Sequence, residues 1–190
     1  MEHSKVRPIT RLFDAFEQLD QHHPGKDREE PLQRPQPARY QTETPEEQHQ
    51  GIPLQSLQLI AAGGDAKANL ELGNRYRKGD GVPMDLVAAW NHYVSAARSG
   101  SLEAMTNIGV MYDQGQTVPA DPATACRCYR HAAERGFAVA QYNLAIMYAD
   151  GLGVERDQAL ALAWFRAAAQ KGYQPAIEAC DWLEELMPST

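Results

Sequence analysis

The chain has 190 residues, of which 43% are hydrophobic and 23% charged, and its formal net charge is -7. This composition is sufficient for one ordinary domain and a tail. The acidic balance, with both signs scattered along the chain, argues against a nucleic-acid or anionic-membrane surface. The sequence has no stretch of about 18 consecutive apolar residues, so it predicts no integral membrane segment.

Residues 1–20 predict a short amphipathic helix. Its apolar side chains share one narrow stripe of the helical period: Ile9, Leu12, Phe13, Phe16 and Leu19. Because two phenylalanines are costly to leave in water, we expect the stripe to dock. The repeat domain of the same chain, a second copy (a dimer) and a separate partner are the three possible targets. The segment lacks the apolar region of a signal peptide and a lipoprotein cysteine, so we expect a cytoplasmic protein.

Residues 21–50 predict a disordered linker. They are rich in Pro, Gln, Glu and Arg, and they cannot bury enough apolar surface to offset the entropy of ordering. Adjacent His22 and His23 have no cysteine or third histidine at ligand spacing. We therefore predict no metal site there.

From about Gly51 the sequence repeats with a period of 36 residues. Four kinds of residue recur in three successive units: Tyr76, Tyr112 and Tyr148; Gly79, Gly115 and Gly151; Val82, Val118 and Val154; Asp85, Asp121 and Asp157. Residues 51–190 are thus predicted to form one repeat domain. Its three complete repeats span residues 68–103, 104–139 and 140–175. Residues 53–63 match only the second half of a unit and residues 176–187 only the first half, so both are predicted to be capping helices.

Each unit predicts two helices. In the second unit Ala104, Ile108 and Met111 lie on one helical face, and Gly115 supplies the positive φ that ends a helix. Asp121 and Pro122 then suit the N-cap and first position of the next helix. Since one helix pair cannot bury its own apolar face, stacked pairs must share a core. The predicted fold is therefore an all-α solenoid, preceded by the disordered tail.

The pattern is detailed enough to compare with known repeats. Repeat one carries Leu72-Gly73, Tyr76, Gly79 and Gly81-Val82, and repeat three carries Leu144, Tyr148, Gly151, Gly153-Val154 and Trp164-Phe165. Over residues 51–187 this pattern resembles the Sel-one-like repeat (SLR), a relative of the tetratricopeptide repeat. The resemblance implies a right-handed solenoid. Thr117 departs from it at the second loop glycine, so that loop must bend differently or carry strain, and Ala145 departs at the glycine of the first helix.

The resemblance also implies a binding groove. In tetratricopeptide repeats the first helix of each pair lines the concave side, and its variable positions here are Leu70, Asn74, Arg77, Lys78, Thr106, Val110, Asp113, Gln114, Tyr142, Ile146, Ala149 and Asp150. Val110, Tyr142 and Ile146 are apolar where solvent would favour polar residues, which indicates a candidate peptide groove. The alternative is that Val110 and Ile146 pack between neighbouring helices.

Residues capable of catalysis have a structural explanation. Cys128 falls in the position of Trp164 and Cys180 in the position of Leu72, so both are read as small core residues, and Cys126 is too close in sequence to Cys128 to pair with it on a helix. His92 has no carboxylate or nucleophile at a meaningful spacing. The repeated aspartates are those expected of helix caps. We predict no catalytic residue, cofactor or metal.

The sequence therefore favours a non-enzymatic adaptor, regulator or scaffold that holds a segment of another, unidentified protein. SLR relatives commonly serve in bacterial signalling, envelope assembly and host interaction. One alternative is a small hydrolase of the penicillin-binding or lactamase type, activities associated with some members of the family. A thiol- or metal-handling protein is the other.

Overall fold

The computed structural model describes residues 51–186, and within that range the chain forms eight helices and no strand. The helices are α2 (Leu54–Ala62), α3 (Ala66–Lys78), α4 (Leu86–Arg98), α5 (Leu102–Gln114), α6 (Pro122–Glu134), α7 (Ala138–Asp150), α8 (Gln158–Ala169) and α9 (Gln174–Leu186). The predicted docking segment 1–20 and linker 21–50 lie outside the described residues.

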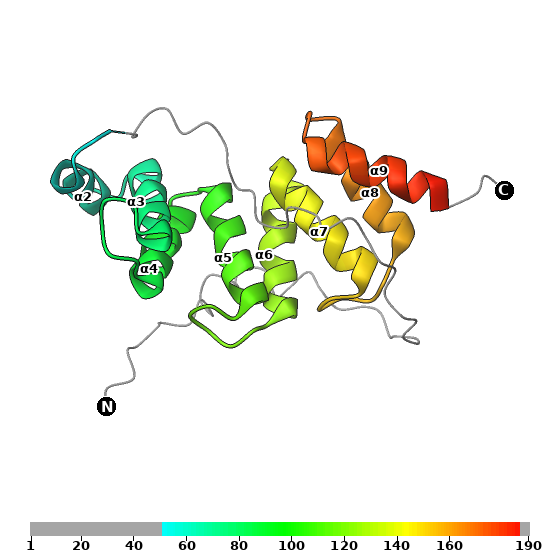
Figure 1. Ribbon diagram of the computed structural model, residues 1–190, viewed down its shortest axis with the longest axis horizontal. Helices are drawn as coiled ribbons and strands as arrows, with labels where there is room; N and C mark the ends of the chain where they lie inside the picture. Colours follow the sequence, from blue (N-terminus) through cyan, green and yellow to red (C-terminus); the bar gives the residue numbers. More distant parts are fainter. Residues whose placement is uncertain (1–50, 187–190) are drawn as a thin grey trace.

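The helices stack as successive pairs (Figure 1). Helices α3 and α4, α5 and α6, and α7 and α8 pack most extensively against each other, and each pair also contacts the next one along the chain. Helix α2 lies at one end of the array and α9 at the other. The prediction of an all-α solenoid with half-repeat helices at both ends of the stack is confirmed.

The recurring aspartates and glycines set the helix ends. Asp85, Asp121 and Asp157 are the N-caps of α4, α6 and α8, and their carboxylates accept hydrogen bonds from backbone N–H groups of the first turn. Gly79, Gly115 and Gly151 end α3, α5 and α7 with φ of 75°, 65° and 68°, a left-handed conformation that favours glycine. The aspartates and glycines that recur every 36 residues therefore mark the helix boundaries.

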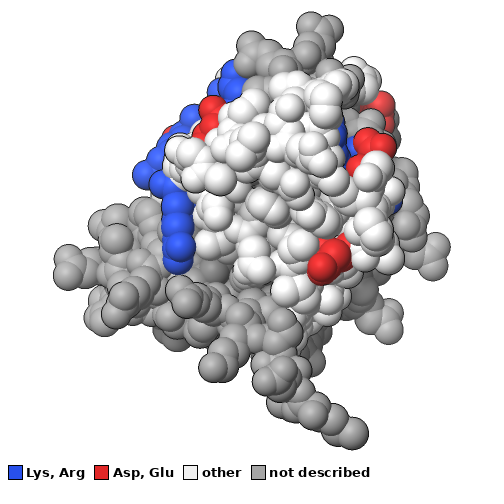
Figure 2. Space-filling model, turned by 90° about the vertical axis from the view of Figure 1, so that its left-hand side faces the viewer, with Lys and Arg blue, Asp and Glu red and all other residues white. Residues whose placement is uncertain are grey.

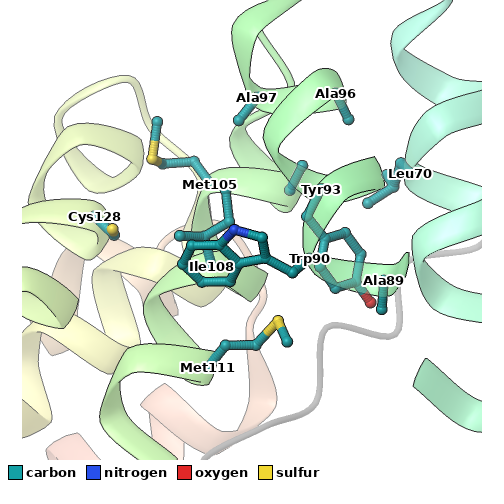
Figure 3. Close-up of a cluster of buried hydrophobic side chains, with 11 residues drawn as sticks. Leu70, Ala89, Trp90, Tyr93, Ala96, Ala97, Met105, Ile108, Met111 and Cys128 are labelled. Atoms are coloured by element: carbon teal, nitrogen blue, oxygen red, sulfur yellow. The ribbon is translucent and has the colours of Figure 1, made fainter. Parts of the chain in front are cut away.

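The core is a chain of clusters between neighbouring helices. A small cluster joins α2 and α3 through Leu57 and Leu72. Figure 3 shows the next one, where the ring of Trp90 on α4 lies among Met105, Ile108 and Met111 of α5. Further clusters join α5, α6 and α7, and then α7, α8 and α9. Each helix pair thus buries apolar side chains against the next pair along the stack, as expected for stacked repeats.

Candidate partner-binding surface

The structure places the predicted groove residues on the first helix of each pair, with very different exposure. Seven of them are buried: Leu70, Asn74, Thr106, Val110, Tyr142, Ile146 and Ala149. Arg77, Asp113 and Asp150 are half-buried, and Lys78 and Gln114 are exposed. The surface accessible to a partner is therefore concentrated at the C-terminal ends of α3, α5 and α7.

The three apolar residues that were expected to face solvent do not. Val110, Tyr142 and Ile146 are only 8%, 2% and 2% exposed. Val110 belongs to the cluster between α5, α6 and α7, and Ile146 to the cluster between α7, α8 and α9. The ring of Tyr142 meets those of Phe165 and Tyr173 edge-on, with centroids 5.4 and 5.3 Å apart. This burial matches the packing alternative for Val110 and Ile146, and a partner-binding role for them stays a prediction.

Hydrogen bonds order the groove residues of α3. The Tyr93 hydroxyl of α4 donates to Asn74 Oδ1 at 2.8 Å and accepts from Arg77 Nε at 3.1 Å. One turn away, Arg75 Nε donates to Glu71 Oε1 at 2.7 Å in a largely buried ion pair. These contacts hold Asn74, Arg75 and Arg77 in a defined geometry, so the basic C-terminal end of α3 is ordered.

Two buried asparagines share the face of the predicted groove residues. Asn107 and Asn143 occupy the same repeat position on α5 and α7, and they are 4% and 3% exposed. The Nδ2 atom of each is buried and has no hydrogen-bond partner in the part of the chain that the structure describes. A buried donor without an acceptor costs about 1–3 kcal/mol, so its presence in two adjacent units requires an explanation.

We define the inner-face stripe as Asn107, Val110 and Gln114 on α5 together with Asn143, Ile146 and Asp150 on α7. The spacing i, i+3, i+7 places the three residues of each helix on one side of it. The stripe runs from a buried amide through an apolar side chain to a polar residue at the helix end. Sequence reasoning missed the two asparagines, although their recurrence 36 residues apart was visible.

Within the described residues, the cysteines and histidines do not gather into a reactive site. Cys126, Cys128 and Cys180 form no disulfide bond within the described residues, and all three are buried. Burial raises the pKa of the Cys128 thiol far above its ordinary value, which disfavours the reactive thiolate. Burial also lowers the pKa of His92, whose Nδ1 lies 3.0 Å from Asn69 Oδ1. Within residues 51–181, no three His, Cys, Asp or Glu side chains lie together in a way that could hold a metal ion.

Comparison with known proteins agrees with this geometry. The Sel1 repeat model matches residues 66–101, 102–137 and 138–173, which is more than half of the chain. The chain belongs to the Sel1 repeat family. Sel1 repeats are generally protein–protein interaction modules. The matched repeats begin where α3, α5 and α7 begin, two residues before the predicted boundaries at 68, 104 and 140.

Two solved Sel1 repeat structures are similar. One is c5321, a protective antigen of uropathogenic Escherichia coli strains with an SLR fold. It is 40% identical, with a TM-score of 0.64 over 66% of this chain, and the match spans 27% of the antigen. The other is a Sel1 repeat protein from Oxalobacter formigenes, 36% identical, with a TM-score of 0.62 over 67% of this chain and 96% of that protein. No curated protein matches the chain. Among the described helices, none has the length and apolar character needed to cross a membrane.

Proposed function

We propose that this Sel1 repeat protein is a non-enzymatic bacterial adaptor that holds an extended segment of a partner protein along the inner-face stripe. The observation that supports this most is the pair of unpartnered amides of Asn107 and Asn143. Both Nδ2 atoms are buried, so each could donate a hydrogen bond to a backbone carbonyl of the partner only where binding moves the side chains that cover it. Because the two residues occupy equivalent positions in adjacent units, they would contact the partner at regular intervals.

Charge at the ends of the first helices would orient the bound segment. Lys78 and the half-buried Arg77 close α3, whereas Asp113 and Asp150 lie at the ends of α5 and α7. A segment with an acidic residue toward α3 and a basic residue toward α7 would complement this order. Such charges act mainly on orientation and association rate. We place the protein in the cytoplasm, in keeping with cysteines that form no disulfide bond among the described residues.

The experiment starts from the partner. Full-length protein is used to capture partners from the native cell, and the dissociation constant of the recovered partner is then measured by calorimetry. The test variant is Asn107→Leu with Asn143→Leu, which removes both amides and keeps the number and branching of the side-chain heavy atoms. Partner affinity is expected to fall at least ~10-fold. The melting temperature should stay the same or rise, because two unsatisfied donors are removed.

A matched control lies on the same helix. Gln141 of α7 is also buried. Its Nε2 donates to the Ala133 carbonyl at 3.1 Å, so its donor is satisfied, although its Oε1 has no partner among the described residues. Gln141→Leu should therefore lower the melting temperature and leave affinity nearly unchanged. The proposal fails if no partner binds saturably. It also fails if the asparagine double variant binds as tightly as the wild type, or if it loses stability as the Gln141 variant does.

Charge is tested with a second matched pair. Lys78→Glu at the end of α3 and Arg98→Glu at the end of α4 make the same charge change at exposed positions. Only the first is expected to weaken partner binding, by ~3- to 10-fold at low salt, with the difference shrinking as salt is raised. If both variants changed the partner affinity equally, the binding site would not lie on the first helices.

A further inference from the structure

Helix α2 is the second helix of a unit whose first helix is not among the described residues. Its residues align, 36 positions earlier, with those of α4, so Leu57 corresponds to Tyr93 and Ile60 to Ala96. In the three complete units the position of Ile60 holds Ala96, Ala132 and Ala168, and all three are fully buried. Ile60 is 40% exposed. An apolar side chain at a core position of the repeat is therefore in contact with solvent.

The exposed side of α2 is the side that meets a first helix elsewhere in the stack. In the first complete unit, His92 of α4 stacks on Tyr76 of α3 and contacts Asn69, and Ala96 lies one turn further along the same side of α4. The corresponding residues of α2 are Ser56 and Ile60, and both are exposed. We name this side of α2, defined by Ser56 and Ile60, the open face.

The surroundings of the open face suit an apolar helix. Helix α2 contains no charged residue. Figure 2 views the molecule from the α2 end, and the centre of this surface is largely free of charged side chains, with Lys and Arg gathered along one edge. Leu59, which flanks the open face, is 77% exposed. A docked helix would cover apolar area here without burying an unpaired charge.

One segment of the same chain has the required length and pattern. Residues 8–20 number 13, as do α3, α5 and α7, and they carry the stripe of Ile9, Leu12, Phe13, Phe16 and Leu19. The linker 21–50 would span about 30 Å as a flexible coil, more than the ~20 Å length of a 13-residue helix. It returns to a fixed point, because Arg75 Nη1 of α3 donates to the Ile52 carbonyl at 3.1 Å.

We propose that residues 8–20 form the first helix of this incomplete unit and dock on the open face of α2 in the same chain. The N-terminal segment is then a part of the solenoid, and α2 is the second helix of a fourth pair. Docking within the chain is favoured over a second copy because the linker keeps the segment at high effective concentration beside α2. The inference does not depend on the proposed partner site.

Hydrogen–deuterium exchange of the full-length protein, resolved by mass spectrometry, tests this. Amides of residues 8–20 are expected to exchange at least ~10-fold more slowly than those of the linker, equally at low and high protein concentration. Ile60→Glu should abolish this protection. Ser56→Glu should do the same, and because Ser56 is exposed, that variant does not disturb the described core.

The control is Gln58→Glu, two residues before Ile60 and therefore about 200° around the helix from it. It adds the same charge to α2 and should leave residues 8–20 protected. Unprotected residues 8–20 in the wild type would overturn the proposal. So would protection that survives both Ser56→Glu and Ile60→Glu, which would mean docking elsewhere, such as on the first helices. Protection that grows with concentration, together with a dimer in sedimentation, would assign the open face to a second copy.

Discussion

Glycine and tyrosine are paired across each of the first two helix hairpins. A Cβ atom added to Gly73 would lie 2.5 Å from Cε1 of Tyr93, and one added to Gly109 would lie 2.7 Å from Cε1 of Tyr129. The ring of the second helix thus occupies the space that a side chain on the first would need. In the third unit alanine replaces the glycine at Ala145, and the facing position holds Phe165, which has no hydroxyl to anchor its ring. The two changes occur together.

The buried thiols give a first prediction. Cys126 and Cys128 are 1% and 0% exposed, and burial raises the pKa of Cys128. Because the thiolate is the reacting species, native protein should react with Ellman's reagent at least ~100-fold more slowly than protein in guanidinium chloride, where all three thiols should titrate. Two or more thiols reacting rapidly in native protein would revive the thiol-handling alternative.

His92 gives a second prediction, on pH. Asn69 Nδ2 donates to the carbonyls of Ala61 and Asp65, both at 2.9 Å, so its Oδ1 faces His92 and accepts from Nδ1–H. Burial lowers the pKa of His92 in the folded state. The unfolded state therefore binds a proton at a higher pH than the folded state does. This contribution to stability is complete above pH ~6.5 and is lost as the pH falls toward the folded-state pKa.

The melting temperature of the wild type should therefore fall between pH 8 and pH 5.5, and His92→Gln should fall less. Burial, together with Arg135, also lowers the pKa of His131, so His131→Gln should remove a separate part of the slope. The double variant should be the least pH-dependent of the four proteins. A His92→Gln protein with the pH profile of the wild type would contradict the assignment.

At the scale of elements, two loops between paired helices have the same backbone conformation at a glycine but different packing around it. Gly81 and Gly153 occupy the same loop position, with φ of 68° and 67°. A Cβ atom on Gly81 would meet nothing within 4 Å, whereas one on Gly153 would lie 2.3 Å from the backbone carbon of Pro122 in the preceding unit. The third loop thus packs on the start of α6, and the first loop does not pack in this way.

The third prediction compares alanine at these two positions. Gly81→Ala should cost about 1–2 kcal/mol in unfolding free energy, from the left-handed backbone alone. Gly153→Ala carries the same strain and a backbone clash, so it should cost at least ~2 kcal/mol more. Urea denaturation of the two variants gives the difference. Equal costs would mean that the third loop does not pack on α6.

The helix boundaries could be predicted from the sequence because they depend on local chemistry that recurs in every unit. Asp121 caps α6 and Gly115 ends α5 through contacts within a few residues, and these contacts do not depend on how the helices pack. The exposure of the groove residues could not, because it depends on residues far along the chain. Tyr142 is covered in part by Phe165 and Tyr173, which are 23 and 31 residues later. Periodicity gives the side of a helix on which a residue lies and not how closely its neighbours approach.

At the scale of the whole array, residues 51–186 have no single core, and this determines how they should unfold. The clusters follow one another along the stack, each shared between adjacent helix pairs. Stability in such an array is approximately a sum of repeat and nearest-neighbour interface terms. The interface between the first two complete units depends heavily on Trp90, which is 1% exposed and meets the ring of Tyr112 edge-on at 5.3 Å (Figure 3 shows its surroundings).

The fourth prediction is that Trp90→Ala uncouples the N-terminal units from the rest. Truncating a fully buried tryptophan costs about 3–5 kcal/mol, here mostly from the interface between α4 and α5. Hydrogen exchange should therefore accelerate in residues 54–98 and change little in residues 138–180. Trp164→Ala, a half-buried ring between the later clusters, should cost less and give the reverse pattern. Uniform acceleration along the whole stack in the Trp90 variant would mean that the repeats unfold as one cooperative unit and that nearest-neighbour additivity does not hold.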